Sequence, residues 1–194
     1  MILTDKRRCT WPGNDSLYVA YHDEEWGVPL YDDDRLFEFL ILETFQAGLS
    51  WITILRKREN FRKAFDNFDY QKIAQYNAEK YNSLLEDTGI IRNKLKISSA
   101  IHNAQMFMKV QEEFGSFSNY IWQFTDGKPI QNAFKTNKEI LAKTELSDKI
   151  SKDLKRKGFK FIGSTTMYAF MQATGIVNDH LVDCFRYKEI KNMS

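Results

Sequence analysis

The sequence is poor in residues that interrupt helices or cross-link small domains. Its 194 residues include 3 prolines, 9 glycines and 2 cysteines. So few turn-forming residues disfavour a many-stranded sheet, and two thiols cannot form the dense disulfide framework of a small secreted domain. No apolar run reaches the roughly 20 residues that a membrane span requires. We therefore expect a cytoplasmic protein with reduced cysteines and no contact with a membrane.

Neither sign of charge is in excess. The 28 Lys and Arg residues against 26 Asp and Glu residues give a net charge of +2. This balance excludes a histone-like basic protein and an acidic disordered chain. A hydrophobic fraction of 43 % is enough for a buried core, and the length is that of one domain. We expect residues 1–194 to form a single unit, in which any nucleic-acid contact depends on where the basic residues cluster.

Apolar residues recur with helical spacing along most of the chain, and no segment alternates for long with the period of a strand. Capping residues precede several of these segments, and glycine ends several. The pattern predicts an all-α fold. Helices are expected at about 35–48, 51–65, 77–86, 93–113, 116–124, 147–157 and 165–174, with a further short helix capped by Asp69. Residues 130–143 are the least patterned stretch.

One acidic residue lies where a helix is otherwise apolar. Glu43 is the only charged residue between Glu38 and Arg56. An ionised carboxylate among apolar neighbours is costly unless it is partnered. It could tie down a nearby helix N-terminus or an arginine, or it could line a ligand pocket. Gln46 and Trp51 follow within two turns, and this mixture of polar and aromatic residues favours a pocket.

Aromatic residues flank both this acid and the first metal-type residues of the chain. They are Trp11, Tyr18, Tyr21, Trp26 and Trp51. Aromatic residues most often pack in a core. The alternative is a stacking cage for a flat ligand, which a cationic ligand would suit well.

Both cysteines and two of the three histidines fall into two pairs. Cys9 and His22 lie near the start, and His180 and Cys184 lie near the end. The spacing of the second pair would place both side chains on one side of a helical turn, as metal chelation requires. Four N and S ligands form a closed tetrahedral set, which is typical of a structural zinc site. A Cys9–Cys184 disulfide and a chance scatter are the alternatives, and His102 has no partner.

A short turn containing Gly89 is predicted to join two helices. Such a turn can offer backbone N–H groups to a phosphate, and Arg92, Lys94 and Lys96 add positive charge beside it. Taken alone, the segment favours a plain helical hairpin with a solvated basic face. A second basic run is also typical of a solvated helix face: Lys152, Lys155, Arg156, Lys157 and Lys160.

Six segments in order resemble the bacterial DNA-3-methyladenine glycosylase I family. They span nearly the whole chain and are residues 8–11, 17–29, 42–51, 89–92, 157–163 and 178–184. The resemblance implies an all-α helix-hairpin-helix DNA glycosylase fold, with the hairpin motif at about 78–113. It also implies that residues 1–30 and about 160–190 pack together around one structural Zn²⁺ ion per chain. Its ligands would be Cys9, His22, His180 and Cys184.

The resemblance also assigns roles to the pocket and the DNA-facing residues. It implies that Glu43 and Tyr18 are the catalytic residues. The residues implied to bind the base are Tyr21, Trp51 and Trp11. Leu49 is a candidate wedge for the vacated base stack, the alternative being an ordinary core residue. Further DNA contacts are expected from Gly89, Arg92 and Lys94. The catalytic aspartate that many members of the wider superfamily carry after the hairpin has no counterpart, because no aspartate lies between Asp87 and Asp126.

The chemistry of the implied substrate makes that absence tolerable. Methylation of adenine at N3 makes the base a cation and a good leaving group, so an enzyme needs mainly to flip the base out and hold it. Each cation–π contact would favour the charged base by about 0.5–2 kcal/mol. The resulting hypothesis is a monomeric glycosylase without lyase activity, associated with the bacterial nucleoid. It would hydrolyse N3-methylated adenine from alkylated double-stranded DNA and leave an abasic site.

Two other classes of protein would share some of these features. A non-catalytic, zinc-stabilised helix-hairpin-helix DNA-binding protein would keep the hairpin and the metal ligands, but it would not need a carboxylate in an apolar helix beside Trp51. A zinc hydrolase would need an open coordination position on the metal, whereas four protein ligands close it. Both classes therefore explain the sequence less completely than a glycosylase does.

Overall fold

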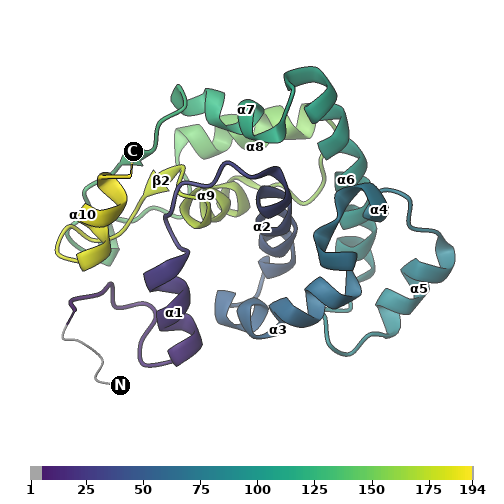
Figure 1. Ribbon diagram of the computed structural model, residues 1–194, viewed down its shortest axis with the longest axis horizontal. Helices are drawn as coiled ribbons and strands as arrows, with labels where there is room; N and C mark the ends of the chain where they lie inside the picture. The colour runs from purple at the N-terminus through teal and green to yellow at the C-terminus, as the bar shows by residue number, and fades with distance from the viewer. Residues whose placement is uncertain (1–5, 194) are drawn as a thin grey trace.

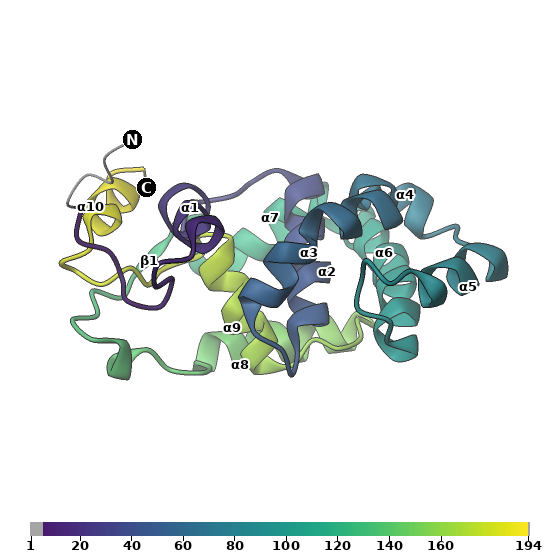
Figure 2. The same cartoon turned by 90° about the horizontal axis from the view of Figure 1, so that it is seen from below.

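The computed structural model describes residues 6–193, so the first five residues of the N-terminal segment predicted to pack around zinc lie outside it. The prediction of an all-α fold is confirmed (Figures 1 and 2). Within the described residues the α-helices are α1 Ser16–Glu24, α2 Asp33–Gln46, α3 Trp51–Ala64, α4 Tyr70–Ile73, α5 Ala78–Glu86, α6 Lys94–Phe114, α7 Phe117–Trp122, α8 Glu145–Arg156, α9 Ser164–Ala173 and α10 Phe185–Lys191. None of these helices has the length and apolar character needed to span a membrane.

Short elements complete the fold. Turns of 3₁₀ helix cover Asp66–Phe68, Gln123–Thr125 and Asn137–Glu139. Two strands, β1 Ile130–Gln131 and β2 Val177–Asn178, pair in parallel. This pair was not predicted, because two residues are too few to show an alternating pattern. It fastens the start of the poorly patterned stretch to the segment that follows α9.

Most helix starts follow from local capping. The Asp32 carboxylate accepts a hydrogen bond from the backbone N–H of Arg35 at the start of α2, and the Asn93 side chain caps α6 in the same way. Ser50 precedes α3, but its hydroxyl pairs with that of Thr53 and leaves the backbone N–H groups uncapped. The sequence analysis missed α1 and α10, which are too short to show a clear apolar stripe.

Helix α2 is the centre of the molecule (Figure 1). Every residue from Leu36 to Phe45 is buried, and α3, α6, α7 and α9 pack around it. Glu38, one of the two buried acids of this helix, pairs with Arg62 at 2.7 Å and with Arg35 at 3.5 Å. The other acid, Glu43, forms no ion pair with these arginines and lies about one and a half turns further toward the end of the helix.

Helix α6 holds the end of α2 through a buried lysine. The Lys96 ammonium group donates to the carbonyl oxygens of Phe45 at 2.8 Å and Ala47 at 2.7 Å. These bonds satisfy carbonyl groups that a helix leaves unpaired at its C-terminus. Burial lowers the pKa of Lys96. On α3, Lys57 donates to the carbonyl oxygens of Thr88 and Gly89, so the turn between α5 and α6 is fixed to the helix that follows α2.

A close backbone approach joins α9 to the loop before α2. Gly175 adopts a left-handed φ of +70°, and a Cβ atom there would lie 2.4 Å from backbone atoms of Val28 and Pro29. The same loop donates from the backbone N–H of Gly27 to Gln172 at 3.0 Å. Only glycine combines this conformation with this clearance.

We therefore expect Gly175→Ala to lower the free energy of unfolding by about 3 kcal/mol or more, since the left-handed strain and the backbone clash add. Gly127→Ala is the matched control, because Gly127 has a φ of +76° but no atom within 4 Å of the added Cβ. Its cost is expected to be about 1–2 kcal/mol from strain alone. Urea unfolding measures both, and equal losses would contradict the proposed close approach.

Candidate functional site

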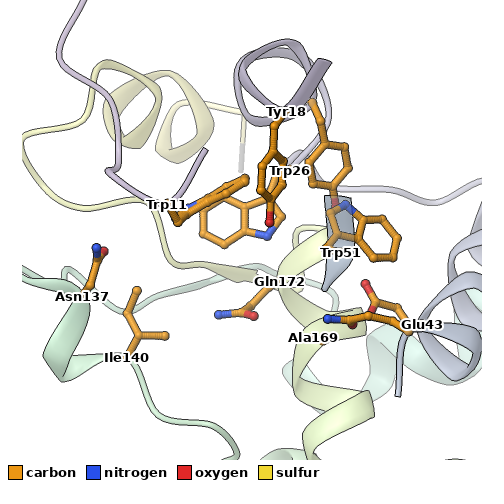
Figure 3. Close-up of a pocket in the computed structure, with 11 residues that line it drawn as sticks. Trp11, Tyr18, Trp26, Glu43, Trp51, Asn137, Ile140, Ala169 and Gln172 are labelled. Carbon is orange, nitrogen blue, oxygen red and sulfur yellow. The ribbon is translucent and has the colours of Figure 1, made fainter. Parts of the chain in front are cut away.

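A cavity of about 380 Å³ opens between α1, α2, α3 and α9. Helix α1 contributes Tyr18 and Tyr21, and Trp51 is the first residue of α3. The segment that contains Asn137 and Ile140 closes the opposite side (Figure 3). The complete lining is Trp11, Tyr18, Tyr21, Trp26, Glu43, Gln46, Trp51, Asn137, Ile140, Ala169 and Gln172. The structure thus brings together all the residues that the sequence assigned to a base pocket.

Aromatic rings form one wall of this cavity. The ring centroids of Tyr21 and Trp51 lie 5.5 Å apart at 44°. Those of Trp11 and Tyr18 lie 4.7 Å apart at 62°, and Trp26 packs edge-on against Trp11 at 5.0 Å. These tilted contacts support the rings from behind, and Figure 3 shows that Trp11, Tyr18 and Trp51 border the open space.

The Glu43 carboxyl group lies at the cavity and has no partner among residues 6–193. Its side chain is buried, and Oε2 forms no hydrogen bond. Burial raises its pKa from 4.5 to about 8. Tyr18 and Tyr21 face Glu43 from α1. The pKa values of both phenols are raised, mainly by burial and to a smaller extent by the nearby Glu43. In the described part of the chain, Glu43 forms neither an ion pair with an arginine nor a hydrogen bond with a helix N-terminus. The first of the two interpretations of this acid is therefore excluded.

Two indole groups of the lining also carry a buried polar atom without a hydrogen-bond partner. Nε1 of Trp11 and Nε1 of Trp51 are buried and unpaired. An unpaired buried polar group costs about 1–3 kcal/mol, and such groups in a native structure call for an explanation. Together with the Glu43 carboxylate they offer two donors and one acceptor. A flat heterocycle with ring nitrogens and an amino group carries complementary groups.

A buried carboxylate orients a further polar residue of the lining. Asp179 accepts hydrogen bonds from Gln172 Nε2 at 2.8 Å, from the Tyr168 hydroxyl at 2.6 Å and from Asn132 at 2.6 Å. Because the Gln172 amide nitrogen is engaged, its carbonyl oxygen turns to the opposite side. Figure 3 shows this oxygen on the side of Gln172 nearer to Glu43.

Four lining residues were missed by the sequence analysis. Asn137 and Ile140 lie in the poorly patterned stretch, which the Asn137 amide connects to the Thr10 hydroxyl at 2.6 Å. No local signal could have placed them at the cavity, because that contact joins residues 127 positions apart. Gln172 offered a weak signal, as a polar residue in an apolar helix, and Ala169 offered none.

Cys9, His22, His180 and Cys184 form a second, buried cluster. Their potential ligand atoms all lie within 4.8 Å of one another, and the cluster could hold a metal ion. Cys184 Sγ lies 3.5 Å from His22 Nε2 and 3.6 Å from His180 Nδ1. Cys9 Sγ lies 3.8 Å from His180 Nδ1. The cluster joins the N-terminal segment and α1 to the turn before α10 (Figure 2).

The other nitrogen of each imidazole ring is held by an acceptor. His22 Nδ1 lies 2.8 Å from the Asp23 carboxylate, which also pairs with Arg8. His180 Nε2 lies 2.9 Å from the carbonyl oxygen of Trp26. Such partners fix the tautomer and leave the inward nitrogen as a ligand. The donor set and its surroundings therefore fit a metal ion.

One detail of the metal prediction is wrong. His180 and Cys184 were expected to share one side of a helical turn, but residues 180–184 form a turn outside the helices. The Cys184 N–H donates to the Leu181 carbonyl at 2.8 Å, and α10 begins only at Phe185. This turn still brings the two ligands together, because its chain reversal replaces the helical spacing.

The thiol groups differ in their tendency to ionise. The hydrogen bond from Cys9, and further bonds with His180 and His22, lower the pKa of Cys184. That same thiol–thiol bond, together with burial, raises the pKa of Cys9. The backbone N–H of Leu181 points at Cys9 Sγ from 3.4 Å, so both sulfur atoms have donors that stabilise negative charge.

The cluster also supports the cavity. The His22 ring lies 5.3 Å from Trp11, and the His180 ring lies 4.7 Å from Trp26. Trp11 and Trp26 are lining residues. Loss of the cluster would therefore loosen the aromatic wall without removing any group that faces a ligand.

The predicted DNA-contact residues are at the surface. Leu49 is 40 % exposed on the turn between α2 and α3, and Arg92 and Lys94 are exposed at the start of α6. Gly89 lies in the turn between α5 and α6, but its N–H donates to Asp87 Oδ1 at 2.7 Å. That N–H is therefore not available to a phosphate in this structure.

Comparisons with known proteins agree on one family. The methyladenine glycosylase family model matches residues 11–187. DNA-3-methyladenine glycosylase 1 of Escherichia coli is 47 % identical over 180 residues, which are 93 % of this chain and 96 % of that protein. A crystal structure of 3-methyladenine DNA glycosylase I is 48 % identical and superposes with a TM-score of 0.89 over 92 % of this chain and 98 % of its own.

A second solved structure concerns ligand recognition. It describes 3-methyladenine recognition by 3-methyladenine DNA glycosylase I from Staphylococcus aureus, and it is 37 % identical with a TM-score of 0.89. The superposition covers 92 % of this chain and 95 % of that one. Because the family model and these relatives span nearly the whole sequence, the chain belongs to the methyladenine glycosylase family.

Proposed function

We propose that this protein is a DNA repair glycosylase that hydrolyses the N-glycosidic bond of N3-methylated adenine in alkylated DNA. The observation that carries the proposal is the buried, unpartnered carboxyl group of Glu43 in an aromatic cavity. Such a group is expensive in the free protein. A cationic base with hydrogen-bond donors would satisfy its charge and its unpaired oxygen at once.

The aromatic wall supports the same substrate. Tyr21 and Trp51 border the cavity beside Glu43, and a cation over such a ring gains about 0.5–2 kcal/mol. Neutral adenine would not gain this energy. The related enzymes are named for 3-methyladenine, and the Tyr18 hydroxyl and the Gln172 oxygen would orient the base.

The cavity supports hydrolysis without lyase activity. A lyase step requires an amine that attacks the sugar and forms a Schiff base. The lining contains no lysine among the residues that the structure describes. The positive charge of the methylated base already weakens the bond to the sugar, so Glu43 and Tyr18 need only hold the base and stabilise its departure while water completes the reaction.

We further propose that a monomer engages double-stranded DNA around the flipped nucleotide. Leu49 would fill the gap left in the stack. Arg92 and Lys94, at the hairpin formed by α5 and α6, would contact phosphates. A chromosomal substrate would place the enzyme at the nucleoid, in the bacterial cytoplasm.

Zinc is the metal that best suits the four-residue cluster. Ligands at about 2.0–2.3 Å from a tetrahedral zinc ion lie roughly 3.4–3.8 Å apart. The nitrogen–sulfur distances of 3.5, 3.6 and 3.8 Å fall in this range. Two cysteines and two histidines would close the coordination shell, so one zinc ion per chain would stabilise the fold and bind no substrate.

The pocket assignment predicts how excision responds to substitution. Glu43→Gln and Trp51→Ala should each lower kcat/KM for release of 3-methyladenine by about 10- to 1000-fold, because each removes an interaction with the cationic base. Release is measured by mass from methylated duplex DNA. Tyr31→Ala, at an exposed aromatic residue outside the cavity, should excise as the wild type does. Wild-type rates in both pocket variants would contradict the assignment.

Glu43 also predicts a pH dependence of stability. The unfolded chain ionises this group near pH 4.5, whereas the folded protein keeps it protonated up to about pH 8, so stability declines as the pH rises between these values. Glu43→Gln has no such proton to lose. The free energy of unfolding of the wild type relative to this variant should therefore fall by several kcal/mol, at most about 5, over this range.

Urea unfolding of both proteins across the range checks the sign. A difference that stays constant with pH would show that Glu43 ionises normally. The same titration should appear in catalysis, because the ionised carboxylate is the form that complements a cation. The value of kcat/KM for the wild type should then fall as the pH drops below about 8.

The zinc proposal predicts metal content and stability together. Purified protein should contain one zinc ion per chain, and Cys184→Ser should lose it with a decrease in Tm on the order of 10 °C. His102→Gln is the matched control, because His102 lies outside the cluster. Full zinc content in Cys184→Ser would contradict the ligand set, and loss of activity without loss of stability would point to a catalytic metal.

A further inference from the structure

A strained aromatic residue is displayed on the turn between α8 and α9. Phe161 is 40 % exposed and has a left-handed φ of +57°. This conformation is rare for a bulky side chain, and it persists only where the surroundings enforce it. Phe159, two residues earlier, and Ile162, the next residue, are buried at 3 % and 1 % exposure. The buried side chains of Phe159 and Ile162 therefore anchor the turn, while the ring of Phe161 lies outside the core.

Side chains from two helices fix the backbone of this turn. Asn103 donates to the Lys160 carbonyl at 2.9 Å and accepts from the Lys160 N–H at 2.8 Å. His102 Nε2 lies 2.8 Å from the carbonyl oxygen of Gly158. From α8, the Ser151 hydroxyl donates to the Ile162 carbonyl at 2.6 Å. The outward direction of Phe161 is thus set before any partner arrives.

The same face of α6 holds the turn that carries Leu49. Lys96 binds the carbonyl oxygens of Phe45 and Ala47 at the end of α2, four and two residues before Leu49. Lys96 and Asn103 are seven positions apart, so they share a helix face about two turns, or roughly 10 Å, apart. In Figure 2 the α2–α3 turn and the α8–α9 connection both lie on the lower side of the molecule. Leu49 and Phe161 are therefore two exposed apolar residues on turns that are both hydrogen-bonded to α6.

The charge around Phe161 suits a polyanion. Lys152, Lys155 and Lys160 are exposed, and none of them forms an ion pair with a residue in the described part of the chain. Nucleic acids combine stacked aromatic bases with closely spaced phosphates. An exposed ring flanked by unpaired lysines matches both features of a nucleic acid.

We propose that Phe161 is a second apolar contact with the DNA duplex, which packs against the base stack to one side of the flipped nucleotide. Lys152, Lys155 and Lys160 would contact the flanking phosphates. This proposal rests on the proposed function, because it adds a contact to the same DNA-binding surface. It also accounts for the strain at Phe161, since a rigid ring binds with little loss of conformational freedom.

Binding of fluorescent duplex DNA that contains an abasic-site analogue tests the proposal. Phe161→Ala should weaken binding by about 5- to 100-fold, the range for loss of one base–aromatic stack. Phe161→Trp keeps an aromatic ring and should retain the wild-type affinity. Tyr31→Ala is the matched control at another exposed aromatic residue, 52 % exposed and stacked on Trp122, and should bind as the wild type does.

Free 3-methyladenine serves as the second probe. Phe161→Ala should bind it as tightly as the wild type does, because Phe161 does not line the cavity. Phe161→Gly relieves the left-handed strain, so it stays folded if the alanine variant does not, and it should show the same loss of duplex binding. Duplex affinity within twofold of the wild type in the folded Phe161 variants would overturn the proposal.

The two hypotheses fail in different ways. A wild type that binds the duplex but neither binds free 3-methyladenine nor excises it would refute the proposed function. The comparison at Phe161 would still stand, because it is scored by duplex affinity. A wild type that excises the base, together with unchanged duplex affinity in Phe161→Ala, would refute only the second contact.

Discussion

The burial of α2 on all sides is the constraint on which the rest of the structure depends. A helix surrounded by other helices can place a carboxyl group where water does not reach, and Glu43 occupies such a position at the cavity. The cost of that burial is visible in its raised pKa. Glu38, one turn and a half earlier, shows the ordinary solution, because two arginines neutralise it. The contrast between these two acids of one helix supports the proposal that Glu43 binds a ligand.

The surrounding elements can be understood by what they do for that helix and its cavity. Lys96 from α6 satisfies the end of α2, and Lys57 from α3 fixes the hairpin turn. The Cys and His cluster braces Trp11 and Trp26 from behind. In the proposed function, the base and the DNA backbone would be recognised by elements that share direct hydrogen bonds. A displacement at the hairpin would then reach the cavity through α6.

Selectivity in this arrangement would come from charge more than from shape. Tyr21, Trp51 and the Glu43 carboxylate all favour a cation over the neutral base of the same outline. The oriented amide of Gln172 adds an acceptor, and the carbonyl and carboxylate oxygens face the cavity from the side opposite the rings (Figure 3). Because the methylated base leaves readily, a pocket of this kind can be effective by binding and orientation, without a strong general base.

Local sequence determined the helical class, most helix boundaries, the unusual acid at position 43 and the four residues of the metal cluster. These features depend on spacing, capping and composition, which act over a few residues. The tertiary structure alone decided that Glu43 has no arginine partner within the described residues and that Asn137 and Ile140 close the cavity. It likewise decided that His180 and Cys184 meet in a turn and not along a helix. It also decided that the ring of Phe161 faces outward, because Asn103, His102 and Ser151 hold its turn from distant parts of the chain. Contacts between distant segments leave no periodic signal, since their geometry exists only once the chain has packed.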